Sequence, residues 1–299
     1  MDRVTQDSLP FALPPGVLLG ALGVLGFSFS LPATRLAVAD LDPFLVAFGR
    51  AVVAGVLSVA VLAATRAPRP TPAQWRSLVL VAIGVVVGFP LCTSLALHRV
   101  PASHGAVVVG LLPAATAVAA VLRAGERPTR AFWLAGGAGL VAVVAFALSQ
   151  GGGGLGAADA ELLLAVVLCA VGYAEGGRLS RELGGARTIC WALLLSLPVT
   201  VVVAGAALAQ NGAHGGATAW LGFAYLSVIS MFLGFFAWYA GLARGGVAKI
   251  GQIQLAQPVV SLLWAALILG EPVGPGTVAA ALAVLACVVA TQRTRVARV

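Results

Sequence analysis

Long apolar stretches, separated by short clusters of charged residues, proline and glycine, are the main pattern along this chain. They lie at residues 15–35, 43–65, 76–97, 102–123, 131–149, 160–180, 188–209, 218–242, 247–269 and 275–292. Each is close to the roughly 20 residues that a helix needs to cross a hydrocarbon core about 30 Å thick. The stretches do not alternate polar and apolar residues as membrane barrel strands do. The pattern therefore predicts an all-α integral membrane protein with ten transmembrane helices.

Composition excludes a water-soluble domain. Hydrophobic residues make up 60% of the 299 residues and charged residues only 9%, with a mean hydropathy of +1.02. Soluble domains carry about 25% charged residues. The net charge of +8 does not indicate a nucleic-acid partner, because the basic residues are not gathered into one patch and no aromatic-basic recognition motif accompanies them.

Basic residues alternate between the two sides of the predicted bundle. With ten spans, fifteen of them fall on one side: Arg3, Arg66, Arg69, Arg76, Arg123, Arg127, Arg130, Arg178, Arg181, Arg187, Arg244, Lys249, Arg293, Arg295 and Arg298. The other side has only Arg35 and Arg99, while Arg50 lies within the second span. Basic residues accumulate in cytoplasmic loops, so both termini are predicted to be cytoplasmic.

The chain contains an internal repeat. Residues 95–128 align without a gap on residues 240–273, with a constant offset of 145 that matches Arg99 with Arg244 and Pro113 with Pro258. A similar echo matches Phe27 with Tyr173. Two five-span halves result, at 15–149 and 160–292, joined by a glycine-rich linker at 150–159. Because five is odd, the halves are predicted to have inverted topology, which places a substrate site between them and permits alternating access.

Several motifs resemble those of the drug/metabolite transporter superfamily, and within it the ten-helix EamA-type exporters. The resemblance rests on Phe48-Gly49-Arg50-Ala51, on the proline centres at Pro113 and Pro258, and on the Gly-Glu endings at Glu126 and Glu271. It covers nearly the whole chain. It implies export of small metabolites across the bacterial inner membrane from a central cavity lined by both halves. The aromatic amino acid exporters look like the nearest branch.

Glu175 is the leading candidate for binding substrate. It lies within the sixth span, three residues before Arg178, so the two can pair on one helix face. One interpretation is a structural ion pair near the cytoplasmic end; the other is a cavity carboxylate that binds a substrate ammonium group or a proton. Tyr173 precedes Glu175 on the same helix, and aromatic candidates for an apolar or cationic side chain are Phe27, Tyr173, Trp238 and Tyr239.

The ninth span supplies a polar stripe. Gln254, Gln257 and Ser261 share one helix face. They either form hydrogen bonds between helices or line a water-filled cavity. Pro113 and Pro258 occupy equivalent mid-span positions and are candidate hinges. Arg50 is expected to snorkel outward or to pair within the bundle, and a structural or gating role is favoured over binding of a substrate carboxylate.

The sequence favours a secondary transporter that exports small amphipathic metabolites, with amino acids as the leading class and drugs, amines or nucleobases as the alternative. A membrane-embedded lipid enzyme would need paired acids and bases or a metal cluster, and neither pattern is found. The four cysteines stand alone in apolar runs, so we expect no metal and no cofactor. No ATP-binding motif is present, which leaves a proton, another ion, an exchanged solute or the substrate's own gradient as the driver.

Overall fold

The computed structural model describes residues 14–150, 156–272, 274–294 and 296–298. Helix fills every one of the ten predicted apolar segments. In the first half the helices are α1 (Pro15–Ser28), α2 (Ser30–Asp40), α3 (Pro43–Ala64), α4 (Pro72–Val81), η1 (Ala82–Gly88), α5 (Phe89–Arg99), α6 (Ala102–Val109), α7 (Leu112–Ala124) and α8 (Arg130–Gln150). In the second half they are α9 (Ala157–Leu183), α10 (Gly185–Asn211), α11 (Ala217–Tyr225), η2 (Leu226–Leu233), α12 (Gly234–Gly245), α13 (Val247–Gly251), η3 (Gln252–Leu255), α14 (Ala256–Leu269) and α15 (Pro275–Gln292).

Seven helical stretches of the described residues are long and apolar enough to cross a membrane. They are Pro15–Asp40, Pro43–Ala64, Pro72–Arg99, Ala157–Leu183, Gly185–Asn211, Ala217–Gly245 and Val247–Leu269. The apolar helix Leu112–Arg123 is shorter. A bundle of long helices is therefore established, while the count of ten crossings stays a prediction.

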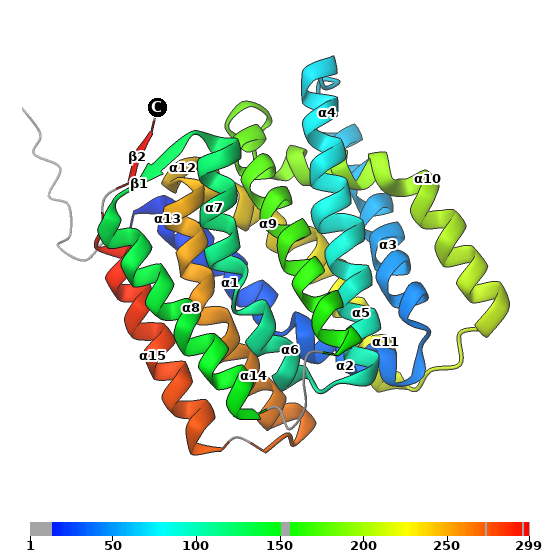
Figure 1. Cartoon of the computed structure of the whole chain (residues 1–299). Coiled ribbons are helices and arrows are strands. Elements are labelled where there is room, and N and C mark those ends of the chain that lie inside the picture. Colours follow the sequence, from blue (N-terminus) through cyan, green and yellow to red (C-terminus); the bar gives the residue numbers. More distant parts are fainter. Residues whose placement is uncertain (1–13, 151–155, 273, 295, 299) are drawn as a thin grey trace, which may run out of the picture.

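Several helix pairs join the two halves. Helix α3 packs on α10, α8 on α15, and α1 on α12, and each pair combines one helix from each half (Figure 1). Glycines allow the closest of these approaches: a side chain at Gly241 would place its Cβ 2.7 Å from the backbone nitrogen of Gly20. Tight contact between small residues is how membrane helices associate, since lipid supplies no hydrophobic drive.

Irregular segments recur at the offset of the sequence repeat. The π-helical segments η1 and η2 occupy equivalent positions, 82–88 and 226–233. Helices α7 and α14 both end at a left-handed glycine, Gly125 with φ 65° and Gly270 with φ 68°. Glycine adopts this conformation without a steric penalty, which explains the repeated Gly-Glu endings.

A carboxylate after each of these glycines caps a helix of the other half. Glu126 accepts hydrogen bonds from the backbone N–H groups of Val247 and Ala248, at 2.8 and 2.7 Å. Glu271 accepts them from Ala102 and Ser103, at 3.1 and 3.0 Å. Carboxylates stabilise helix N-termini by pairing with their free N–H groups. The three residues of the first cap, Glu126, Val247 and Ala248, match Glu271, Ala102 and Ser103 of the second at the offset of 145, so the capping is reciprocal.

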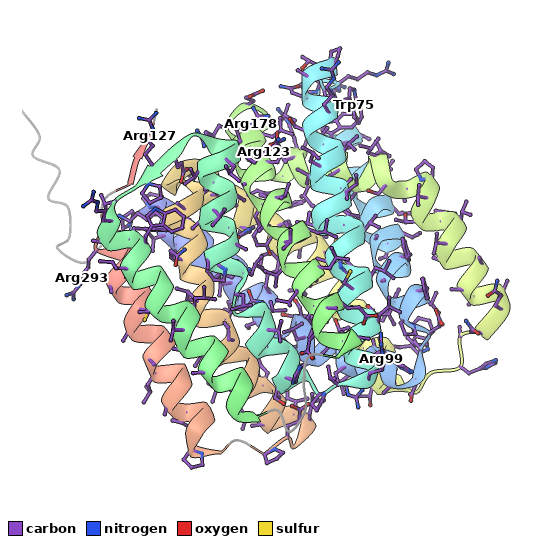
Figure 2. All side chains as sticks on the ribbon, in the orientation of Figure 1. Trp75, Arg99, Arg123, Arg127, Arg178 and Arg293 are labelled. Carbon is purple, nitrogen blue, oxygen red and sulfur yellow. The ribbon has the colours of Figure 1, made fainter. Side chains whose placement is uncertain are left out.

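A small sheet closes one end of the bundle. Strand β1 (Glu126–Pro128) pairs antiparallel with β2 (Val296–Arg298) beside the C-terminal end of the described chain (Figure 1). Arg123, Arg127 and Arg178 lie at this end, whereas Arg99 lies at the opposite end (Figure 2). This is the segregation that the charge pattern predicts, although the side of the membrane at which each end lies remains a prediction. Most of the predicted linker, and Arg3 and Arg295, fall outside the described residues.

Candidate functional site

Three helices break where proline removes a backbone donor. The first break separates α1 from α2 at Phe29, three residues before Pro32, and the others precede Pro113 in α7 and Pro258 in α14. Each proline then lies in the first turn of the following helix, where its missing N–H is tolerated. The α-helices are therefore interrupted just before Pro113 and Pro258, while a bend and a role as hinges at these residues stay predictions.

Side chains of the second half donate hydrogen bonds to carbonyl groups at the first break. Pro32 deprives the Ser28 carbonyl of its helical donor, and the Ser261 hydroxyl donates to that carbonyl at 2.5 Å. The Gln257 amide nitrogen is 3.4 Å from the Phe27 carbonyl oxygen and donates to it. Gln257 and Ser261 therefore act partly as the bonds between helices that the polar stripe allows.

A central cavity lies between the halves, with a volume of about 30 Å³, room for about two water molecules. Its wall consists of Phe27, Ser30, Leu31, Arg50, Val85, Phe89, Pro90, Leu112, Cys169, Tyr173, Ser230, Met231, Phe235, Gln254 and Gln257. Much of the wall consists of repeat-equivalent pairs: Phe27 with Tyr173, Val85 with Ser230, Pro90 with Phe235, and Leu112 with Gln257. The cavity therefore lies where an axis relating two inverted halves would pass.

Buried polar side chains in this cavity wall bond to one another, within the second half and between the halves. The Gln254 amide nitrogen donates to the Tyr173 hydroxyl at 3.3 Å and to the Gln257 amide oxygen at 3.1 Å. The Ser30 and Ser230 hydroxyls lie 2.7 Å apart and share a hydrogen bond. The Gln254 amide oxygen has no hydrogen-bond partner among the described residues.

Aromatic rings form the apolar part of the wall. The Phe27 and Tyr173 rings are stacked with centroids 6.5 Å apart, and Phe235 lies against both, at 5.0 and 6.1 Å. Trp238 is fully buried behind this group, 5.2 Å from the Tyr173 ring. Tyr239 is also fully buried, and its hydroxyl donates to the Gly172 carbonyl at 3.2 Å. Trp238 and Tyr239 support the wall without lining the cavity.

Arg50 lines the cavity, is buried there, and forms no ion pair within the part of the chain that the structure describes. Its side chain is only 2% exposed, and within the described residues its Nε atom has no hydrogen-bond partner. We expected the guanidinium group either to extend to the membrane surface or to pair with a negative charge in the bundle, and the described structure shows neither.

Glu175 lies away from the cavity, in an ion-pair cluster near the arginine-rich end. Its carboxylate accepts hydrogen bonds from Arg178 Nη2 at 2.6 Å and Arg123 Nε at 3.1 Å. Arg178 Nη2 also donates to the Ser77 hydroxyl at 2.7 Å, which links α9 to α4 and, through Arg123, to α7. The structural ion pair that the sequence offered as one interpretation is the arrangement found here.

Ser261 and Pro258 line a separate, smaller cavity beside the central one. A larger apolar cavity of about 370 Å³ opens between α7, α8 and α9, with Gln252 in its wall. Gln252 donates to the Pro113 carbonyl at 3.1 Å. Because the remaining lining of this larger cavity is apolar, the central cavity is the better candidate for a polar solute.

The sequence missed the serine pair, Phe235 and the two π segments. Single hydroxyl groups in spans usually bond to their own helix, so Ser30 and Ser230 gave no signal. The repeat offset did contain a usable signal. The repeat equivalents of Gln257 and Tyr173 are Leu112 and Phe27, and both of these residues lie in the cavity wall. π segments often mark functional sites, but they have no sequence signature.

A bundle of long apolar helices with a cavity between its two halves is the architecture of a multi-pass membrane protein. The sequence model of the EamA-like transporter family matches residues 14–148 and 157–291, which together make up most of the chain. The chain belongs to the EamA-like transporter family, and it is a transporter and not an enzyme.

Relatives agree with this assignment. A Bacillus subtilis (strain 168) protein named "Uncharacterized transporter YdeK" is 49% identical over 278 residues, which are 93% of this chain and 97% of that protein. A solved crystal structure matches the fold with a TM-score of 0.75 over 93% of this chain and 98% of its own, at 20% identity. These comparisons specify no substrate.

Proposed function

We propose that this protein is a secondary transporter that exports small amphipathic metabolites, with amino acids as the main class, by alternating access. The observation that carries the proposal is the central cavity, whose wall combines repeat-equivalent residues of both halves. Transporters built from inverted repeats bind substrate at such an interface. The reciprocal caps at Glu126 and Glu271 support an inverted arrangement, because the carboxylate of each half caps the N-terminus of the equivalent helix in the other half. We place the protein in a bacterial inner membrane with both termini in the cytoplasm.

The chemistry of the wall supports an amphipathic solute. Phe27, Tyr173 and Phe235 offer an apolar surface, while Gln254 and Gln257 offer amides. An aromatic amino acid meets both demands, which supports the aromatic amino acid exporters as the branch to test first.

The cavity volume indicates an occluded conformation. About 30 Å³ holds no amino acid, so one end of the bundle must open before substrate enters. The broken helices at Pro113 and Pro258 flank the cavity region and are the hinges of this movement in our proposal. In this proposal the driver of transport is either the exchange of one solute for another or the movement of a proton.

Counterflow in liposomes tests the proposal. Purified protein is reconstituted into vesicles preloaded with a mixed amino acid pool, and uptake of labelled amino acids is compared with that of empty vesicles. We expect accumulation of labelled aromatic amino acids above the empty-vesicle level. Counterflow of an amine, a drug or a nucleobase, but of no amino acid, would replace the substrate class. No counterflow of any solute by folded protein would contradict the transport proposal.

A further inference from the structure

Arg50 places a buried positive charge in the wall of the central cavity. Its side chain is 2% exposed, and an arginine in a protein keeps its charge at neutral pH. Burying an unpaired charge is strongly unfavourable, so buried charges are normally paired. The positive charge of Arg50 therefore requires a negative charge in or beside the cavity.

The described part of the chain supplies no such negative charge. All eight acidic residues described there engage other groups: Asp40, Asp42, Glu126, Asp159, Glu161, Glu175, Glu182 and Glu271. Their partners are helix N-termini, backbone N–H groups, or other arginine, histidine and amide side chains. No ion pair in the described residues includes Arg50. No acidic side chain of the described residues therefore supplies the anion, whereas a solute that enters the cavity can supply it.

The geometry of a guanidinium group favours a carboxylate. Its planar fork matches the two oxygens of a carboxylate, and a single positive charge is balanced by a single negative one. The same wall contains a second unpartnered group, the Gln254 amide oxygen, which can accept a hydrogen bond from a solute N–H. With the Phe27 and Tyr173 rings, the wall offers one group each for a carboxylate, an amine and an apolar side chain.

We infer that Arg50 is the carboxylate-binding residue of the transport site, so that the transported solutes are amino acids and related carboxylates and not amines or nucleobases. This inference rests on the proposed transport function and specifies its substrate class. It changes the role that the sequence favours for Arg50 from structure or gating to recognition, because the side chain lies in the cavity wall.

Ligand binding to the full-length protein in detergent tests this inference without transport. The probes are L-phenylalanine, 3-phenylpropionate, L-phenylalaninamide and 2-phenylethylamine, which share a ring and differ in the carboxylate and the amine, together with L-leucine and L-leucinamide. Binding is measured by thermal unfolding and tryptophan fluorescence. We expect the carboxylates to bind at least tenfold more tightly than the matched amides and amine.

Variants localise the effect. Arg50→Gln should lower carboxylate affinity by at least about 30-fold, since it removes a buried charged partner. Arg50→Lys should fall between Arg50→Gln and wild type, because lysine keeps the charge but loses the planar fork. Arg76→Gln, at an exposed arginine on α4, is the matched control and should bind as wild type does.

Three results would overturn the role of Arg50. They are equal binding of amine and carboxylate by wild type, wild-type affinity in Arg50→Gln, and no binding of any carboxylate by folded protein. The first of these needs no variant, so a folding defect in Arg50→Gln cannot hide it. Counterflow of a neutral or cationic solute at equal rates in wild type and Arg50→Gln would leave the transport proposal standing while overturning this one.

Discussion

Arg50 and Glu175 are both charged side chains buried within long helices, yet their surroundings differ. Glu175 is 3% exposed and contacts two arginines, Arg123 and Arg178, that come from two helices. Arg50 is equally buried and forms no ion pair within the described residues. One charge is neutralised by the chain, and the other requires a solute. Pairing, more than burial, therefore separates a structural charge from a binding charge in this bundle.

The location of each charge agrees with this division. Arg50 lies in the cavity between the halves, whereas the Glu175 cluster joins α4, α7 and α9 near the arginine-rich end. A cluster that ties three helices together resists their separation, and opening of that end would have to break it. On this division, the paired carboxylates act on stability and opening, while Arg50 acts on binding.

Neutralising Glu175 should give the largest loss of stability. Glu175→Gln leaves two arginines without their shared carboxylate, and we expect unfolding free energy to fall by about 2 kcal/mol. This is below the roughly 3–5 kcal/mol typical of a broken buried pair, because both arginines are partly exposed and can be hydrated. Carboxylate binding and the pH profile of transport should stay unchanged. Thermal unfolding in detergent, ligand binding and counterflow measured against pH check these expectations.

Glu182→Gln provides the control for this variant. Glu182 lies on the same helix, is half exposed, and its nearest oxygen is 3.7 Å from Arg178 Nη1. Its replacement should change stability by no more than about 0.5 kcal/mol. If Glu175→Gln instead keeps full stability but loses substrate binding or shifts the pH profile, Glu175 is the cavity carboxylate and the comparison with Arg50 fails.

The two helix caps extend the comparison to both ends of the bundle. Glu126→Gln and Glu271→Gln should each lower stability by about 1 kcal/mol, with the larger loss at Glu126 because that carboxylate is fully buried and lies 3.8 Å from Arg181. Neither should weaken carboxylate binding by more than about twofold. Each cap ties the halves at a different end, so Glu126→Gln should favour opening at the arginine-rich end and Glu271→Gln at the other.

Labelling from each side of the membrane measures this opposite effect. A cysteine introduced as Ser30→Cys, in a variant without the four native cysteines, reports access to the cavity wall by a membrane-impermeant maleimide. We expect Glu126→Gln to increase labelling from the side of Arg127, and Glu271→Gln from the side of Arg99. Equal labelling of both variants from both sides would show that the caps stabilise helices without restraining either end.

The sequence predicted the positions of the helices well because apolar runs of this length allow little else in lipid. The repeat offset also predicted which residues are equivalent, as Glu126 and Glu271 illustrate, but not that each would cap the other half. That contact depends on how the halves pack, which no local pattern contains.

The interpretation of Glu175 as a cavity residue conflicted with helix geometry that the sequence already contains. Tyr173 and Glu175 are two residues apart and point to different faces of α9, so both could not face one cavity. Gln254 and Gln257, three residues apart, do share a face and both line the cavity. Helix-face geometry could not predict the state of Arg50, because whether Arg50 has a partner depends on the arrangement of all the helices.

The smallest expected effect concerns the connection between the site and the ends of the bundle. Pro258→Ala restores a backbone N–H that can bond the Gln254 carbonyl and regularise the break between η3 and α14. A straighter helix should slow counterflow by about threefold, equivalent to less than 1 kcal/mol in the barrier, without changing expression or carboxylate affinity. Pro275→Ala, at the first residue of α15, is the control, because no helical bond is gained there. Unchanged rates in Pro258→Ala would remove Pro258 as a hinge and leave opening to Pro113, the Glu175 cluster and the helix caps at Glu126 and Glu271.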